Sequence, residues 1–277
     1  MHAGLHACRH ACYYACMQTI ANANNKGGVG KTQVTLGLAS AAKARGYRTL
    51  VVDIDGQANS TSALLPADAE PVTGGTAAIL AGTSKIAEEV ISSTWDGVDL
   101  LPASVNVTNY ERETSPGAEF RLRQALREQI VVDTYDLVLI DCPPAVGRVT
   151  LAGLVAADDV IIVTEPSKDA TDGVINLLET IDVVREYYSP ELNIAGVALN
   201  KMQLQGKEVT FRAAELRQEM GEELMLEAIP LRSILADSRG AGVPIHEMPG
   251  IRAHTVATIF DGYLDHIMNE NGEIANV

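Results

Sequence analysis

The sequence predicts a doubly wound α/β fold, in which a mostly parallel sheet carries helices on both faces. From residue 18 onward, short β-branched runs alternate with longer segments of helical periodicity, which is typical of strand–helix–strand units. Runs such as 137–140 and 160–163 are apolar at every position, so both faces of those strands are expected to be buried. The chain has 277 residues, 47% of them hydrophobic, which suffices for a sizeable core. We therefore expect residues 17–277 to form a single domain.

The individual elements follow from the same patterns. Strands are expected at residues 18–23, 49–53, 98–101, 137–141, 160–164, 194–200 and 225–229. Helices are expected at residues 31–44, 118–131, 150–156, 171–187, 209–220 and 253–268. Residues 66–75 are rich in Pro, Gly and acidic residues and are expected to form a surface excursion.

Charge and cysteine usage exclude several classes of protein. The 21 basic and 36 acidic residues give a net charge of −15, so any nucleic-acid contact must be confined to a local patch. No apolar run approaches the roughly 18 residues of a membrane-spanning helix. Cys142 is the single cysteine after residue 16, which rules out a disulfide framework in the body of the protein and favours a reducing, cytoplasmic compartment.

The first sixteen residues differ from the rest of the chain. Histidine and cysteine each recur there at intervals of four, at His2, His6 and His10 and at Cys8, Cys12 and Cys16. Such stripes could hold a metal ion on a helix. The Ala-rich composition and Met17 instead favour a disordered or artefactual leader, with Met17 as the biological start.

A glycine-rich loop carries the strongest functional signal. It reads Asn25-Lys26-Gly27-Gly28-Val29-Gly30-Lys31-Thr32 and stands between a predicted strand and a predicted helix. Glycines let backbone N–H groups turn toward phosphate oxygens, and the start of the helix adds a positive dipole end. Lys31 is expected to reach the β and γ phosphates and Thr32 to ligate Mg²⁺.

Acidic residues mark the carboxyl ends of two predicted strands. Asp53 and Asp55 follow one apolar strand, and Asp141 ends another. In open α/β sheets ligands collect at this edge, and a carboxylate placed there requires a cation. Magnesium bound to a nucleotide is the partner that we expect.

These segments together resemble the ParA/MinD family of ATPases. Lys-Gly-Gly-Val-Gly-Lys-Thr is similar to the deviant Walker A loop of that family, in which a second, signature lysine precedes the glycines. The strand ending Asp53-Ile54-Asp55-Gly56-Gln57 resembles the second motif, although Gly56 replaces the usual proline, which predicts a looser turn. Leu137 to Pro144 resembles the Walker B strand. The likeness extends over about residues 18 to 268.

The resemblance implies a P-loop NTPase fold, ATP or ADP with Mg²⁺, and a role for each matching residue. Catalysis is assigned to Lys26, Lys31 and Asp55, with Asp55 orienting the attacking water. Lys26 is expected to cross a dimer interface to the partner's nucleotide. Nucleotide contacts are assigned to Gly27, Gly28, Val29, Gly30, Lys31, Thr32, Gln33, Asn200 and Pro230, the last two near the adenine. The metal is assigned to Thr32, Asp53 and Asp141.

Several branches of the family fit less well. A membrane positioner would end in a basic amphipathic helix, but residues 265–273 are acidic, and the apolar stripe before them is expected to dock on the sheet. An iron–sulfur cluster would need more cysteines than Cys142. An ATP-dependent amidoligase of cofactor biosynthesis and a positioner of a non-DNA cargo stay open.

The ParA/Soj branch is the one that we favour. It implies an ATP-bound homodimer that binds DNA nonspecifically, is nucleoid-associated in that state, and is released by a ParB-like centromere-binding protein, partitioning a plasmid or chromosome. Basic residues of the C-terminal third could form the DNA contact: Lys201, Lys207, Arg212, Arg217, Arg232, Arg239 and Arg252. Two arginines usual in relatives are replaced after Pro230, by Leu231 and Ile234, which weakens this expectation.

Overall fold

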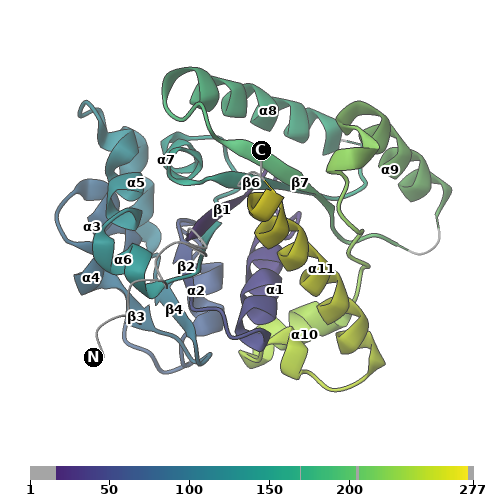
Figure 1. Ribbon diagram of the computed structural model, residues 1–277, viewed down its shortest axis with the longest axis horizontal. Coiled ribbons are helices and arrows are strands. Elements are labelled where there is room, and N and C mark those ends of the chain that lie inside the picture. Colours follow the sequence, from purple (N-terminus) through teal and green to yellow (C-terminus); the bar gives the residue numbers. More distant parts are fainter. Residues whose placement is uncertain (1–16, 169, 204–205, 274–277) are drawn as a thin grey trace, which may run out of the picture.

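The structure is a computed structural model and describes residues 17–168, 170–203 and 206–273. The histidine and cysteine stripes of the first sixteen residues therefore lie outside the described residues. Within the described part, seven strands form one sheet in the order β3-β4-β2-β5-β1-β6-β7. Neighbouring strands are parallel except for β3 and β4, which are antiparallel. The predicted doubly wound α/β fold is confirmed (Figure 1).

Six of the seven predicted strands are confirmed. The strands are β1 (Gln18–Ala23), β2 (Thr49–Asp53), β3 (Ile91–Ser92), β4 (Val98–Leu101), β5 (Leu137–Asp141), β6 (Asp159–Thr164) and β7 (Asn193–Leu199). The short edge strand β3 was not predicted.

The seventh predicted strand, at residues 225–229, is wrong. This segment runs beside β7 but forms only an isolated bridge between Val197 and Met225. Leu226 N donates to Val197 O and Ile229 N donates to Leu199 O. The two donors are three residues apart, whereas the two acceptors are two residues apart. The segments therefore advance at different rates, and a regular parallel ladder of hydrogen bonds cannot form.

The helices lie in two layers. They are α1 (Lys31–Ala44), α2 (Asn59–Leu64), α3 (Thr76–Ala81), α4 (Ile86–Glu89), α5 (Arg121–Leu126), α6 (Gln129–Thr134), α7 (Arg148–Ala156), α8 (Ala170–Tyr187), α9 (Lys207–Met220), α10 (Ser233–Ala241) and α11 (Ile251–Glu273), with 3₁₀ turns η1 (Val105–Arg112), η2 (Ala118–Phe120), η3 (Glu222–Leu224) and η4 (Ile245–Glu247). In Figure 1, α7 and α8 lie above the sheet and α1 and α11 below it.

The single helix predicted at residues 118–131 is wrong. The chain forms η2, α5 and α6 instead, with Glu128 in an extended conformation between the last two. Leu126 and Val131 are both buried. Residues five apart lie about 140° apart around a helix, so one continuous helix would expose one of them. The break at Glu128 lets both enter the core.

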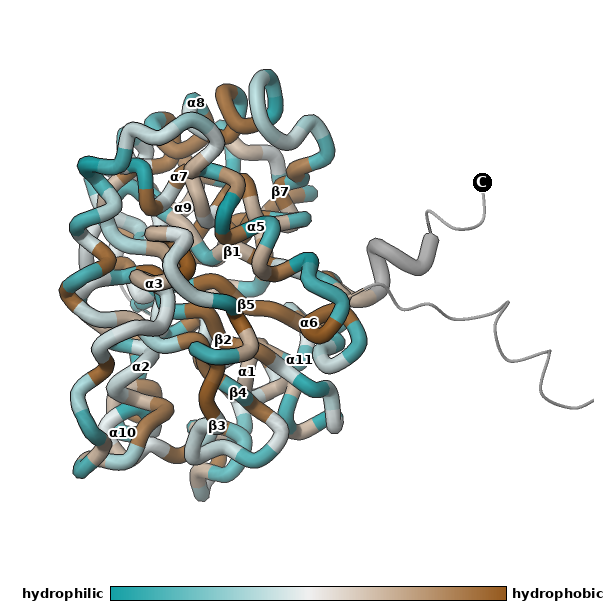
Figure 2. The backbone as a smooth tube through the Cα atoms, turned by 90° about the vertical axis from the view of Figure 1, so that its left-hand side faces the viewer, coloured by the Kyte–Doolittle hydropathy of each residue, from teal (hydrophilic) through white to brown (hydrophobic). Residues whose placement is uncertain are grey.

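Both faces of the sheet are buried, as the continuous apolar runs predicted. In β5, Val138 and Ile140 belong to one core layer, whereas Leu137 and Leu139 belong to the other. Figure 2 shows the hydrophobic colour following β5 and β2 through the interior. The sheet is therefore held from both sides, and its carboxyl edge is left for polar residues.

The apolar stripe of α11 docks inside the molecule, as predicted. Its members are buried: Val256, Ile259, Phe260, Tyr263, Leu264 and Ile267. The Phe260 ring covers Gly37 of α1 so closely that a Cβ there would lie 2.2 Å from the ring. Among the described residues, no helix is long and apolar enough to cross a membrane.

Candidate functional site

The glycine-rich loop connects β1 to α1 at the carboxyl edge of the sheet. Gly28 and Gly30 have φ angles of 77° and 100°, a left-handed region that glycine adopts without strain. A Cβ at Gly30 would also lie 1.9 Å from the Asn200 amide nitrogen. Because α1 begins at Lys31, the first N–H groups of the helix face the loop and can bind an anion.

A cavity of about 360 Å³ lies over this loop. Three segments of the predicted site meet there: the glycine-rich loop, the start of α1 and the turn after β2. The lining residues are Gly27, Gly28, Gly30, Lys31, Thr32, Gln33, Asp55, Gln57, Asn59, Pro144, Lys201 and Arg239. Most of the residues predicted to bind phosphate are thus brought together.

Lys31 is a buried cation at this cavity. Its Nζ donates to the carbonyl oxygens of Lys26 at 3.2 Å and Asn24 at 3.5 Å. Burial lowers the pKa of Lys31, and the nearby Asp141 carboxylate opposes that shift. Among the described residues, none forms an ion pair with Lys31 within 4.0 Å. Its charge is therefore available to a phosphate.

Asp141 has the features of a metal ligand. Thr32 Oγ1 and Ser60 Oγ each donate to its Oδ2 at 2.7 Å. Its Oδ1 is buried and has no partner among the described residues. Burial raises the pKa of Asp141 because the charged form lacks solvation. A carboxylate and a hydroxyl side by side fit Mg²⁺, which prefers oxygen ligands. Ser60 was not predicted from the sequence.

Asp53 is engaged with the protein instead. Its Oδ1 accepts a hydrogen bond from Asp55 N at 3.0 Å, and its Oδ2 accepts two from Thr61 N and Oγ1, each at 2.8 Å. Burial and the adjacent Asp141 carboxylate raise the pKa of Asp53. Asp53 therefore holds the segment after β2 in place, next to the Thr32–Asp141 pair.

Asp55 lies in the turn after β2 and lines the cavity. Its Oδ1 accepts a hydrogen bond from Gln57 N at 3.0 Å, and its carbonyl accepts one from Ala58 N at 2.8 Å. The turn is thus closed by two hydrogen bonds, although Gly56 replaces the expected proline. A carboxylate facing the cavity could orient a water molecule there.

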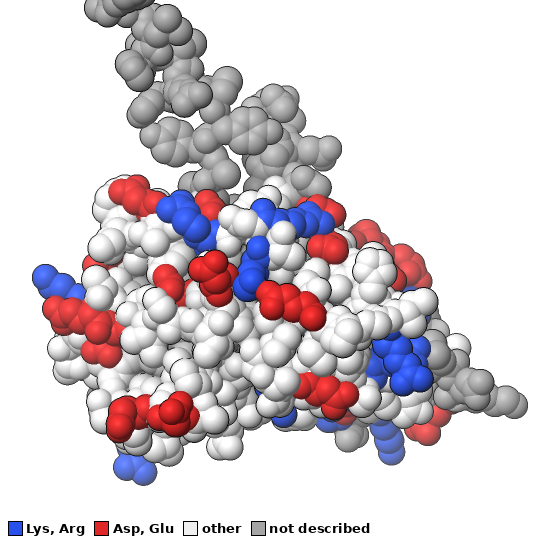
Figure 3. Space-filling view, turned by 90° about the horizontal axis from the view of Figure 1, so that it is seen from below, with Lys and Arg blue, Asp and Glu red and all other residues white. Residues whose placement is uncertain are grey.

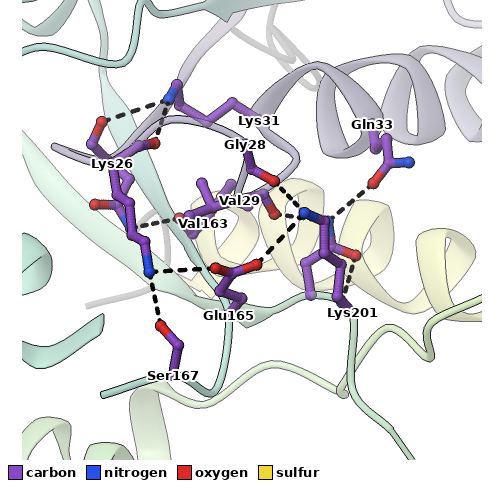
Figure 4. Close-up of polar contacts among 11 residues, drawn as sticks. Lys26, Gly28, Val29, Lys31, Gln33, Val163, Glu165, Ser167 and Lys201 are labelled. Carbon is purple, nitrogen blue, oxygen red and sulfur yellow. Dashed lines mark hydrogen bonds and ion pairs between the residues drawn. The ribbon is translucent and has the colours of Figure 1, made fainter. Parts of the chain in front are cut away.

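Lys26 points away from Lys31. Its Nζ lies 3.2 Å from Glu165 Oε1 and donates to Ser167 Oγ at 2.8 Å (Figure 4). The side chain is 27% exposed. Two lysines of one loop thus have different surroundings: Lys31 faces the cavity, and Lys26 lies at the end of β6 beside an acid that the sequence did not single out.

Lys201 contacts both Glu165 and the backbone of the glycine-rich loop. Its Nζ lies 3.4 Å from Glu165 Oε2 and donates to the Gly28 carbonyl, as Figure 4 shows. Lys201 has a φ of 55°, which is uncommon for a residue with a Cβ and often occurs at functional sites. Glu165 therefore contacts a lysine on each side of the glycine-rich loop.

Three predicted nucleotide contacts lie outside the cavity lining. Asn200 is buried, and its Nδ2 donates to Val29 O at 2.8 Å and to Gln33 Oε1 at 3.1 Å. Val29 is fully buried. Pro230 forms an isolated bridge with Met202 just beyond β7. Asn200 thus supports the loop from behind, and the structure does not bring Pro230 to it.

Cys142 directly follows Asp141 in sequence. It is buried, and burial raises the pKa of its thiol. A neutral thiol in this environment is a small core residue rather than a nucleophile.

Comparisons with known proteins agree with this geometry. A family model described as an AAA domain matches residues 17–194. The chromosome-partitioning ATPase Soj of Thermus thermophilus is 34% identical over 242 residues, which cover 86% of this chain and 92% of that protein.

Solved structures give the same picture. Cobyrinic acid a,c-diamide synthase of Mycobacterium smegmatis, with an ATP analogue and magnesium bound, has a TM-score of 0.74 and 28% identity over 90% of this chain and 95% of its own. The ATP complex of McdA from Cyanothece has a TM-score of 0.81 at 22% identity, over 91% and 96% of the two chains, and supports the fold. With this fold, loop and coverage, the chain belongs to the ParA/Soj family of ATPases.

Proposed function

We propose that this protein dimerises when it holds ATP and Mg²⁺ and partitions plasmid or chromosomal DNA, with a ParB-like protein stimulating hydrolysis. One observation carries the proposal: the two lysines of the glycine-rich loop are separated, Lys31 at the cavity and Lys26 outside it. One lysine can serve the protomer's own nucleotide, and the other can serve a second protomer.

The residues divide the work of hydrolysis. Backbone N–H groups of the loop and the Lys31 ammonium hold the phosphates. Thr32 and Asp141 would hold Mg²⁺, which when bound would neutralise charge on the phosphate oxygens. Asp55 orients the attacking water. Lys26 completes the partner's site after it leaves Glu165. ATP binding thereby favours the dimer, because it supplies the anions that Lys26 binds there.

Sedimentation with ATP, with ADP and without nucleotide tests this proposal. We expect a dimer with ATP and Mg²⁺ and a monomer in the other two states. A monomer in all three states would contradict the dimer, whereas nucleotide binding measured in parallel would show whether the cavity itself functions.

The DNA contact must be built from few residues. Of the seven basic candidates, Lys201 and Arg239 line the cavity. Arg212 pairs with Glu215 and Arg217 with Glu222. The Arg232 and Arg252 side chains have no ion-pair or hydrogen-bond partner among the described residues, and the side chain of Lys207 lies outside what the structure describes. The face in Figure 3 shows basic groups interleaved with acidic ones. Dimerisation would double such a weak patch.

A salt titration of duplex DNA binding tests this part. We expect binding with ATP that weakens steeply as salt rises, and weaker binding with ADP. The variant Arg252→Ala should reduce the salt dependence, and Arg45→Ala, which removes an ion-paired arginine elsewhere, is its control. No DNA binding at low salt in either state would favour a non-DNA cargo.

The diamide synthase similarity supports a second candidate, an ATP-dependent amidoligase. ATP hydrolysis that requires both a carboxylate substrate and an amide donor would favour it. Hydrolysis stimulated by DNA and a ParB-like protein would favour partition.

A further inference from the structure

Arg239 differs from most of the basic DNA-contact candidates because it lines the cavity over the glycine-rich loop, as Lys201 also does. It is exposed and belongs to the last turn of α10. It lines the cavity over the glycine-rich loop together with Lys31, Thr32 and Asp55. It also lines a neighbouring cleft of about 660 Å³, and Asn59 is shared by both. Arg239 therefore lies at the rim of the cavity proposed to hold the nucleotide.

The backbone that carries Arg239 is fixed. The preceding Ser238 is buried, and its Oγ donates to Val243 O at 2.6 Å. Gly242, with a φ of 64°, ends the helix, and its carbonyl accepts a hydrogen bond from Trp95 Nε1 at 2.7 Å. Helix α10 also packs against α1 and α2, which border the cavity. The arginine is thus presented to the rim from a rigid support.

The guanidinium of Arg239 has no charged partner in the part of the chain that the structure describes. Among the described residues, no acid forms an ion pair with it and no acceptor takes a hydrogen bond from it. The other rim cation, Lys201, is paired with Glu165. The dipole of α10 favours a cation at this helix end, but that effect does not require the residue to line a cavity. An unpaired guanidinium beside a phosphate loop is suited to a polyphosphate, which it can bind with two N–H groups.

We propose that Arg239 binds the phosphates of the nucleotide in its own protomer. This reassigns a residue that the sequence grouped with the DNA-binding candidates. The inference rests on the proposed nucleotide site, and it deepens that proposal by adding a contact from α10, far along the chain from the glycine-rich loop.

The test is the affinity for ADP, measured by titration calorimetry at protein concentrations where the chain is monomeric. Arg239→Ala should weaken ADP binding by about tenfold, as expected for one charge-assisted hydrogen bond. Arg239→Lys should lose less, since it keeps the charge without the planar fork. Arg112→Ala removes the same charge from an exposed position that does not line this cavity and should stay within about twofold of wild type.

The outcomes separate the two proposals. If wild type and Lys31→Ala both fail to bind ADP, the nucleotide site itself is wrong. If wild type binds ADP and Arg239→Ala binds it as tightly as wild type and Arg112→Ala do, the inference is wrong. Loss of DNA binding with unchanged ADP affinity would place Arg239 on the DNA surface instead. The unfolding temperature without nucleotide controls for folding. Should Arg239→Ala unfold early, Arg239→Lys and Arg239→Gln provide the same comparison.

Discussion

The two ends of helix α1 differ in whether their charged groups have partners of opposite charge. At its start, Lys31 is buried against carbonyl oxygens, and Asp141 keeps a buried oxygen without a partner. At its end, Lys43 lies 2.7 Å from Glu247, and Arg45 pairs with both Asp261 and Asp265. Between them, Gly37 packs beneath Phe260.

We relate this difference to function at the start of α1 and to stability at its end. Buried charges without partners cost free energy, and the packing of α1 against the sheet and α11 offsets this cost. A ligand with phosphates and a divalent cation would supply the missing partners. Changes at the start should therefore alter binding and catalysis, and changes at the end should alter stability slightly.

The largest effect is expected at the turn facing the start of α1. Asp55→Ala should reduce ATP turnover roughly 1000-fold, because it removes the group that orients water, while the ATP dimer persists in sedimentation. Asp265→Ala, at the other end of the helix region, is the control and should leave turnover unchanged. Near-normal turnover in Asp55→Ala would remove Asp55 from its role.

Lys31→Ala should weaken ATP binding about 100-fold, since the loop loses its buried cation. Lys43→Ala makes the same change three turns further along α1 and should leave the affinity unchanged. If calorimetry gave the two variants equal affinities for ATP, the proposed difference between the start and the end of α1 would be wrong.

Lys26→Ala should preserve monomer ADP affinity but weaken ATP-dependent dimerisation and lower turnover, each by about tenfold or more. Analytical ultracentrifugation and a phosphate-release assay measure the two effects. An unchanged dimer with normal turnover would show that Lys26 stays with Glu165 and serves no second protomer.

Glu165→Gln should shift dimerisation to about threefold lower protein concentration with ATP. The ion pair that holds Lys26 is partly exposed and contributes under about 1 kcal/mol, so its release gives a small gain. Ser167→Ala, which removes the other contact of Lys26, should act in the same direction. Weaker dimerisation in Glu165→Gln would mean that Glu165 organises the loop for pairing.

The smallest effect is expected from His246, at the far end of α1. Its Nδ1 lies 2.8 Å from Ser40 Oγ, and burial lowers its pKa despite Asp261 nearby. The folded state disfavours the charged imidazolium ring, so the neutral His246 ring favours folding. This contribution to stability is fully present above the unfolded-state pKa of about 6.5 and is lost as the pH falls through the lower folded-state pKa. Urea unfolding at pH 7.5 and 5.5 should show a smaller loss for His246→Gln than for wild type. Equal losses of stability in the two proteins would contradict this role of His246.

Much of the site was predictable because local sequence encodes it. The glycine-rich loop, Thr32 and Asp141 occupy a strand end or a helix start, and parallel strands bring such positions to one edge. Helix α1 and strands β1, β2, β4 and β5 were predicted at their observed bounds.

The remaining features depend on contacts between distant segments. Helices α2, α3 and α4 are too short to show a periodic pattern. Glu165 is one residue past a strand, and nothing near it in the sequence indicates that it meets Lys26 and Lys201. In the sequence, nothing distinguishes Arg239 and Lys201 from Arg212 and Arg217. In the structure, the first two line the cavity, whereas the other two pair with glutamates.

By itself, the sequence determined the sheet, the phosphate loop and the acids at its edge, because each depends on neighbours within a few residues: apolar runs, glycines and a helix start. The tertiary structure alone decided that Glu165 holds Lys26 and that Arg239 reaches the rim of the cavity. Those outcomes depend on packing between residues more than a hundred positions apart, such as Lys26 with Glu165 and Thr32 with Asp141, and spacing along the chain does not encode that proximity.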